Sequence, residues 1–149
     1  MKTIFNDDVR RELTGRLNKL TAENRPLWGK MSPAQMLKHC RLWEEMIHQN
    51  QVFKGPLIGR LIGRLILKNV LKTPEFRKNS PTIPEMVVTD SDIDLNEERR
   101  HLITLVNSYP EYNWPDNSFV HPFFGKMTRE QIGILVWLHL DHHLRQFGV

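Results

Sequence analysis

The chain has 149 residues, of which 40% are hydrophobic and 26% are charged, a balance typical of a globular protein with one core. We therefore expect a single domain over residues 1–149. The formal net charge of +4 is spread along the sequence without a nucleic-acid-binding motif, and no apolar run approaches the ~20 residues of a membrane-spanning helix. These features exclude DNA or RNA as a partner and a transmembrane segment. Cys40 is the only cysteine, and the charged residues 1–16 lack the apolar core of a secretory leader, which predicts a cytoplasmic protein.

Two helices are predicted in the first third of the chain. Residues 7 to about 20 carry apolar side chains three or four positions apart, and Asn6 or Asp7 can cap the first turn. Residues 32–35, Ser-Pro-Ala-Gln, have the spacing of a capping box with proline at the first helical position, so a second helix should run to about Gln49. His39 lies beside the apolar stripe of this second helix, which consists of Met36, Cys40, Trp43 and Ile47.

Residues 57–72 form a long amphipathic insertion between the second and third long helices. Cations recur at every fourth position, and nearly all other side chains are apolar; the cations are Arg60, Arg64, Lys68 and Lys72. One interpretation is a solvated cationic face above a segment that packs on the rest of the domain. The alternatives are a homodimer contact, helped by the small residues Gly59 and Gly63, and adhesion to an anionic membrane surface.

Two further long helices follow. Asp92 and Asp94 suit the positive end of a helix dipole, and a helix from there to Tyr109 would bury one leucine-rich face. Residues 128–131 repeat the capping-box spacing and predict a last helix that continues to about Gln146. Runs of alternating polar and apolar residues are lacking between the helices, so we expect little β-sheet. The pattern predicts an all-α fold, an antiparallel four-helix bundle.

The connection from Pro110 to Met127 is rich in aromatic side chains. A connection of this length in a small domain is more often a lid or a binding surface than a spacer. We expect it to border the functional pocket or, alternatively, to plug one end of the helices. His121 within it is a candidate catalytic residue, acting as a proton relay or substrate contact, or else a structural hydrogen-bonding residue.

The strongest candidate for chemistry is the last helix, which contains His139, His142 and His143. His139 and His143 stand one turn apart on the same face, so their imidazoles can converge on one metal ion. His39 is the natural third ligand if the second helix meets the end of the last one. His142 is rotated by about 100° from His143 and should support the site or lie on the surface. The same rotation separates Cys40 from His39. Histidines that do not converge would be partly buried or solvent-facing residues without a chemical role.

Three segments resemble the DinB/YfiT-like superfamily of four-helix bundles. Residues 31–39 look like the entry to the second helix of these proteins, and residues 121–128 and 139–148 are similar to one branch whose activity is uncharacterised. The similarity extends over most of the chain. It implies a bundle with metal ligands at His39, His139 and His143.

The resemblance also implies a metal-dependent enzyme, because characterised relatives include thiol-dependent transferases and isomerases. Three neutral imidazoles leave a bound cation strongly electrophilic, so it could activate water or a low-molecular-weight thiol for hydrolysis of, or transfer to, a small electrophilic substrate. Zinc is the first candidate, and nickel, iron or copper also accept imidazole ligands. Two alternatives stay open: a non-enzymatic bundle that acts through self-association, and a nucleophilic Cys40 paired with a histidine.

Overall fold

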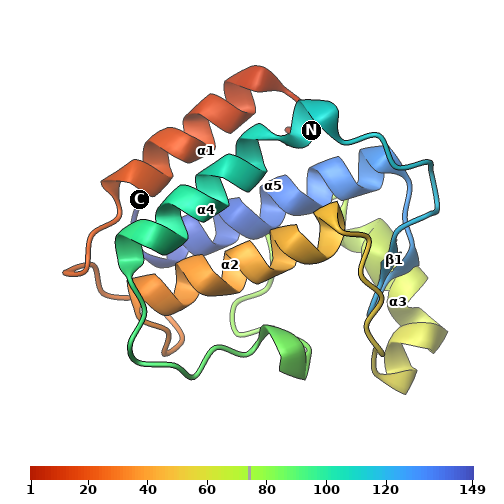
Figure 1. Ribbon diagram of the computed structural model, residues 1–149. Helices are drawn as coiled ribbons and strands as arrows, with labels where there is room; N and C mark the ends of the chain where they lie inside the picture. Colours follow the sequence, from red (N-terminus) through yellow and green to blue (C-terminus); the bar gives the residue numbers. More distant parts are fainter. Residues whose placement is uncertain (74) are drawn as a thin grey trace.

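The computed structural model describes residues 1–73 and 75–149, with the side chain of Arg60 outside the described part. In chain order its elements are α1 (Asp7–Lys19), α2 (Pro33–His48), α3 (Leu57–Val70), the 3₁₀ turn η1 (Pro84–Met86), α4 (Leu95–Asn107), the 3₁₀ turn η2 (Tyr109–Glu111), β1 (Val120–His121), β2 (Gly125–Lys126) and α5 (Arg129–Gln146). The predicted all-α class is confirmed, because helices dominate and the two described strands are two residues long each (Figure 1). In the part of the chain that the structure describes, no helix has the length and apolar character needed to cross a membrane.

Local sequence signals set the starts of α1, α2, α4 and α5. Asn6 accepts a hydrogen bond from the Asp8 amide at the start of α1, and Asp94 caps α4 in the same way. Ser32 and Thr128 each form a complete capping box at the starts of α2 and α5. Because these caps fix where α2 and α5 begin, they also fix which side chains share a face further along each helix.

Helices α1, α2, α4 and α5 lie side by side (Figure 1), with α2 and α1 each packed against both α4 and α5. Their shared core is built from side chains that are almost fully buried, each of which stabilises the fold by about 1.5–3 kcal/mol. This core includes Leu13 and Leu17 from α1, Met36 and Leu37 from α2, Leu102 and Val106 from α4, and Leu138 and Leu144 from α5. The buried core thus holds α2 directly against α5.

The relative directions of the helices differ in part from the predicted antiparallel arrangement. α2 and α5 are antiparallel, but α2 and α4 run in the same direction (Figure 1). Arg41 in the middle of α2 pairs with Glu98 near the start of α4, and His48 at the end of α2 contacts the Leu105 carbonyl near the end of α4. The long connection over residues 49–94 explains the difference, because it returns the chain to its starting end, whereas short loops force antiparallel neighbours.

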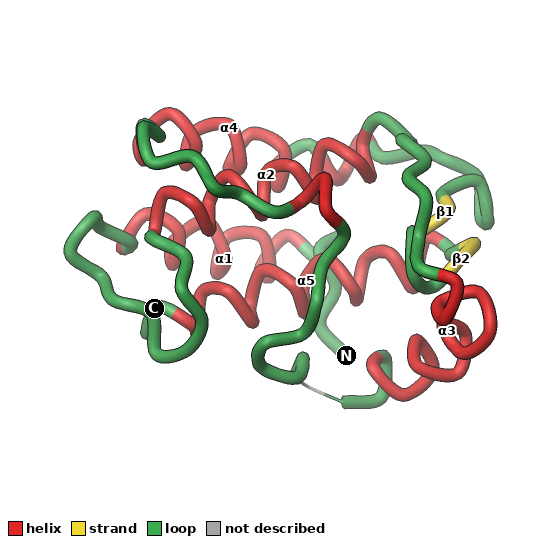
Figure 2. The backbone as a smooth tube through the Cα atoms, turned by 90° about the horizontal axis from the view of Figure 1, so that it is seen from below, coloured by secondary structure: helices red, strands yellow, loops and turns green. Residues whose placement is uncertain are grey.

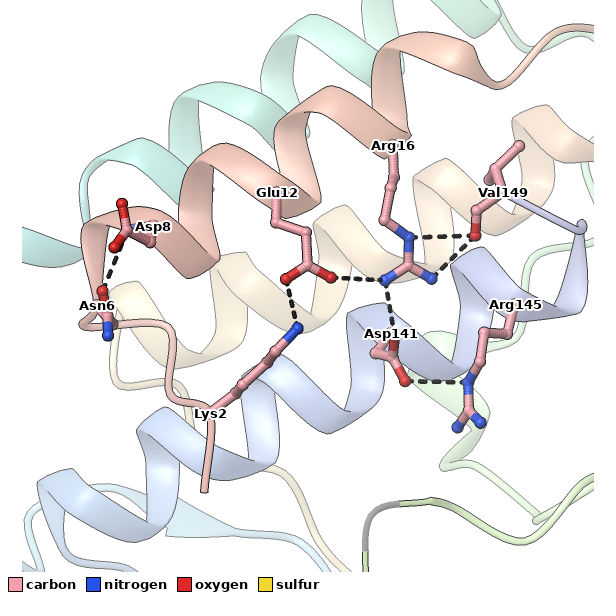
Figure 3. A network of polar contacts seen from close by, with 8 residues as sticks. All are labelled: Lys2, Asn6, Asp8, Glu12, Arg16, Asp141, Arg145 and Val149. Atoms are coloured by element: carbon pink, nitrogen blue, oxygen red, sulfur yellow. Dashed lines mark hydrogen bonds and ion pairs between the residues drawn. The ribbon is translucent and has the colours of Figure 1, made fainter.

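A polar network ties α1 to the C-terminal half of α5 (Figure 3). Arg16 pairs with Asp141 at 2.7 Å and donates two further hydrogen bonds to the carbonyl of Val149. Asp141 also pairs with Arg145 at 3.0 Å. Arg16 and Asp141 are mostly buried, so this network stabilises more than a surface ion pair would. It holds in place the stretch of α5 that carries His139 and His143.

α3 and the β-hairpin lie outside the group formed by α1, α2, α4 and α5, at the end where α2 finishes (Figures 1 and 2). In the hairpin, Val120 pairs with Lys126 and His121 with Gly125, whose φ of +76° is accessible to glycine at little cost. α3 packs against β2. The interpretation that residues 57–72 pack on the rest of the domain therefore holds for one face, and the hairpin provides the contact.

Candidate metal centre

His39 enters the site from the first half of α2. Its side chain is 5% exposed, and its Nδ1 lies 2.8 Å from the carbonyl oxygen of Met86 in η1. Because a carbonyl can only accept, Nδ1 carries the proton and donates it. The neutral ring therefore keeps a lone pair on Nε2, which faces α5.

His139 and His143 approach from α5, one turn apart, as the sequence predicts. Their ring centroids are 4.7 Å apart, and each ring also contacts His39, with centroid distances of 5.2 Å and 4.9 Å. The structure thus brings together all three predicted ligands, and one ligand atom from each lies within 4.8 Å of the others. His39 and His143 are buried, whereas His139 keeps partial exposure.

Gln146, one turn further along α5, holds the Nδ1 side of the His143 ring. Nδ1 of His143 lies 2.9 Å from Oε1 of Gln146, and Nε2 of the same amide donates to the Trp28 carbonyl at 2.7 Å. The Trp28 contact fixes the orientation of the amide, because its nitrogen must face a carbonyl. Gln146 therefore accepts the Nδ1–H of His143 and leaves the Nε2 lone pair of that ring for a cation.

Burial keeps all three imidazoles neutral. It lowers the pKa of His39, against a smaller opposing effect of the Met86 hydrogen bond, and it lowers the pKa of His143 to about 3. The pKa of His139 falls well below its usual range because of burial, and repulsion from His143 and His39 adds to this effect. Neutral imidazole is the form that binds metal ions.

The spacing of one pair of donors fits a metal ion. Nε2 of His39 and Nε2 of His139 are 3.2 Å apart. Two lone pairs repel at this distance, so the pair needs either a proton or a cation between the nitrogens. Nitrogen ligands at about 2.0–2.1 Å from one tetrahedral zinc ion are about 3.3 Å apart, which matches the observed pair.

Aromatic side chains form the wall beside the histidines. The ring centroids of Trp43 of α2 and His139 are 5.3 Å apart. Trp43 also stacks on His121, and His121 stacks on Phe124 with a centroid distance of 4.5 Å. His121 and Phe124 of the connection over residues 110–127 therefore stack in a row that begins at Trp43, the α2 residue next to the cluster. Trp114 of the same connection lies elsewhere, because its indole N–H donates to the carbonyl of His48.

His121 is held by the backbone of its own hairpin. Its Nδ1 accepts hydrogen bonds from the amides of Phe123 and Phe124, both at 3.1 Å, and burial lowers its pKa to about 3. The ring is therefore neutral, with its proton on Nε2. A neutral ring whose lone pair is already engaged is a hydrogen-bond donor and a poor proton relay.

Two neighbours of the predicted ligands have other surroundings. His142 is buried and does not lie on the surface; its ring centroid is 5.2 Å from that of His143, 5.4 Å from that of Trp28 and 6.0 Å from that of Phe76, so of the two predicted roles the structure favours support of the site. Cys40 is buried with its Sγ 3.7 Å from the sulfur of Met36. Burial raises the pKa of the Cys40 thiol well above its usual range, which opposes a nucleophilic role.

Three contributors to the site were not predicted from the sequence. The Met86 carbonyl belongs to the backbone, and Phe76, which lies 6.5 Å from His139, precedes it in the connection after α3. Neither has a sequence signature. Gln146 does have one, because a residue three positions after a helical histidine lies on the same face of the helix.

These observations define a helical protein with a buried cluster of three histidines that could hold a metal ion. The chain belongs to a family described as "Protein of unknown function (DUF1569)", which it matches over residues 6–148. Neither the curated proteins nor the solved structures provide a match to the chain. The family match spans all three histidines and leaves their role to be inferred from the site.

Proposed function

We propose that the protein is a metal-dependent enzyme whose ion is held by Nε2 of His39, His139 and His143. Zinc is the first candidate because all three ligands are nitrogens, and nickel or iron are the others. The observation that carries the proposal is the convergence of three neutral imidazoles, two of which have their outer nitrogens engaged by Met86 and Gln146.

Three protein ligands are typical of catalytic zinc sites, in which a further position is left for water or substrate. A bound cation would supply a Lewis-acid position at which the pKa of a thiol or a water molecule is lowered. His139 is the least buried of the three residues, so a substrate would approach the ion on its side. Structural zinc sites, by contrast, are closed by four protein ligands.

The resemblance to the DinB/YfiT-like superfamily supports a more specific proposal. In this proposal α1, α2, α4 and α5 form the superfamily's four-helix bundle, and α3 is an insertion between its second and third helices. A low-molecular-weight thiol is the cosubstrate, and a small electrophile is the acceptor; hydrolysis of the electrophile is the variant that uses water.

The surrounding residues would position such a substrate. Trp43 and Phe76 present apolar surface beside His139, which favours a partly apolar electrophile. Of the roles that the sequence leaves to His121, substrate contact has the better support. Its Nε2–H can donate to an oxygen of the substrate, whereas its low pKa keeps the ring out of the imidazolium form that a general acid needs at neutral pH.

Elemental analysis of untagged protein tests the ligand set. We expect metal in the wild-type protein and its loss in His39→Ala, His139→Ala and His143→Ala. His101→Ala, at an exposed position of α4, is the matched control and should keep the metal. Retention of wild-type metal content in all three ligand variants would show that the assignment is wrong.

Removal of the metal separates an enzyme from a protein that binds metal only for stability. With an open catalytic position the metal-free protein should stay folded and lose activity, whereas loss of a structural ion should unfold it. Activity is measured as the consumption of a small thiol in the presence of an epoxide or an activated aryl halide.

Alkylation of Cys40 at neutral pH tests the alternative in which this thiol is the nucleophile, and a slow reaction is expected because the thiol is buried.

A further inference from the structure

The outer face of α3 is apolar and exposed. Leu57, Leu61 and Leu65 are 75%, 84% and 63% exposed, and Ile58 and Ile62 lie beside them on the same stripe of the helix. Single exposed apolar residues are common on protein surfaces, but a row of five on one helix is not. This row is the outward face of α3.

The opposite face of α3 is already occupied. A Cβ atom added to Gly63 would lie 2.0 Å from the carbonyl oxygen of Phe123, and one added to Gly59 would lie 2.8 Å from the same atom. The glycines therefore allow the helix backbone to approach the hairpin closely. They are not available for the close helix–helix contact between two copies that the sequence suggested, and the outward face of α3 is fixed by this packing.

Cations flank the outward face, and the segment that carries them contains no acidic residue. The sequence contains no aspartate or glutamate between Glu45 and Glu75, whereas Lys54, Arg60, Arg64, Lys68 and Lys72 all fall in this stretch. Arg64, Lys68 and Lys72 are exposed, and they line a shallow depression together with Gln131 of α5. One side of α3 thus combines an apolar stripe with a row of positive charge.

A second copy of the chain is a poor occupant for this surface. A two-fold contact through α3 would bring Arg64 and Lys68 close to the same residues of the other copy, with no acidic partner in the segment. A bilayer with anionic lipids satisfies both features, because its phosphates attract the cations and its acyl boundary accepts the leucines. α3 has 14 residues, which is too short to span a bilayer, so it would lie on the surface.

We propose that α3 binds the surface of a membrane that contains anionic phospholipids. In this arrangement the outward face enters the boundary between headgroups and acyl chains, and the cations contact the lipid phosphates. Both contributions are needed, because a helix with few apolar residues or little charge binds membranes only weakly.

Vesicle co-sedimentation of the full chain tests the proposal. Wild-type protein should bind vesicles of phosphatidylcholine mixed with phosphatidylglycerol, should bind vesicles of phosphatidylcholine alone far more weakly, and should be released by high salt. The double variant Leu57→Gln/Leu61→Gln and the double variant Lys68→Glu/Lys72→Glu should each bind the anionic vesicles more weakly than wild type, by about tenfold or more. All four positions are exposed, and circular dichroism checks that the variants fold.

Matched controls lie at the end of α1, α2, α4 and α5 that is opposite α3. Leu27→Gln changes a leucine that is 70% exposed, and Lys19→Glu/Lys30→Glu makes the same change in net charge away from α3 (Figure 1). Both should bind like the wild type. The proposal is overturned if wild-type protein does not bind anionic vesicles, or if the α3 variants and the controls lose binding equally. It is also overturned if the outward face instead mediates concentration-dependent dimerisation in the absence of vesicle binding.

Discussion

Gln146 connects one proposed metal ligand to the loop between α1 and α2. Its amide accepts the Nδ1–H of His143 and donates to the carbonyl of Trp28, and the side chain is only 3% exposed. The hydrogen bond to His143 is buried and the one to Trp28 is partly buried, so water replaces neither partner freely. The loop and the ligand are therefore held by one amide.

Replacement of Gln146 by leucine should weaken metal binding and stability together. Loss of the acceptor frees the ring of His143 and should lower metal affinity about 10–100-fold, measured by competition with a chromophoric chelator. The unpaired Trp28 carbonyl should cost about 1–3 kcal/mol in the free energy of unfolding. Gln146→Glu keeps the acceptor and loses the donor, so it should preserve most of the affinity while still reducing stability. Equal metal affinity in the leucine variant and the wild type would show that the contact does not orient His143.

His121→Phe should separate the structural role of this residue from metal binding. Phenylalanine can keep the stack between Trp43 and Phe124, but it leaves the amides of Phe123 and Phe124 without their acceptor. We expect a loss of about 1–3 kcal/mol in urea unfolding. Metal content should be unchanged, because His121 lies outside the cluster of three histidines. Loss of the metal would instead identify His121 as a ligand.

Much of the helical framework could be predicted because its signals are local. The capping boxes at Ser32 and Thr128 and the four-residue spacing of His139 and His143 depend only on neighbouring residues. Once α2 packs against α5, that register places His39 opposite the pair. The cluster was therefore predictable from two helices and one assumption about their contact.

The remaining features depend on contacts between distant segments. The hairpin has strands of two residues, too short for a periodic pattern, and its turn is held by the side chain of His121. The common direction of α2 and α4 depends on the path of residues 49–94, which no helical pattern specifies. The exposure of Leu61 follows from the side of α3 that the hairpin covers, and the sequence alone leaves that choice open.

Glu44 should make the stability of the protein fall as pH rises. Its side chain is buried and accepts a hydrogen bond from Tyr109, and its Oε1 has no hydrogen-bond partner among the described residues. Burial raises the pKa of Glu44 to about 8, against a smaller lowering by the Tyr109 hydrogen bond. The folded protein therefore holds the proton more tightly than the unfolded chain does. The stabilisation that comes from protonated Glu44 is fully present below the unfolded pKa of about 4.5 and is lost as pH rises toward 8.

Urea unfolding of Glu44→Gln at several pH values measures this effect. The stability of the variant relative to wild type should improve by about 2–4 kcal/mol between pH ~5 and pH ~8, because glutamine cannot ionise. Tyr109→Phe removes the hydrogen bond that favours the carboxylate, so it should raise the pKa of Glu44 further and extend the loss of stability to higher pH. A difference between Glu44→Gln and wild type that is independent of pH would contradict a buried, protonated Glu44.

Two glycine-to-alanine substitutions should have opposite effects on stability. Gly15 is exposed within α1, and an added Cβ meets no atom within 4 Å, so Gly15→Ala should stabilise the protein by about 0.5–1 kcal/mol through helix propensity. Gly63→Ala has the same gain in propensity, but its Cβ would overlap the Phe123 carbonyl oxygen. The hairpin must move away from α3, which should cost about 1–3 kcal/mol. Urea unfolding gives both values, and amide hydrogen exchange at Phe123 and Phe124 should rise only in Gly63→Ala. If Gly63→Ala is as stabilising as Gly15→Ala, the close packing of α3 on the hairpin is wrong.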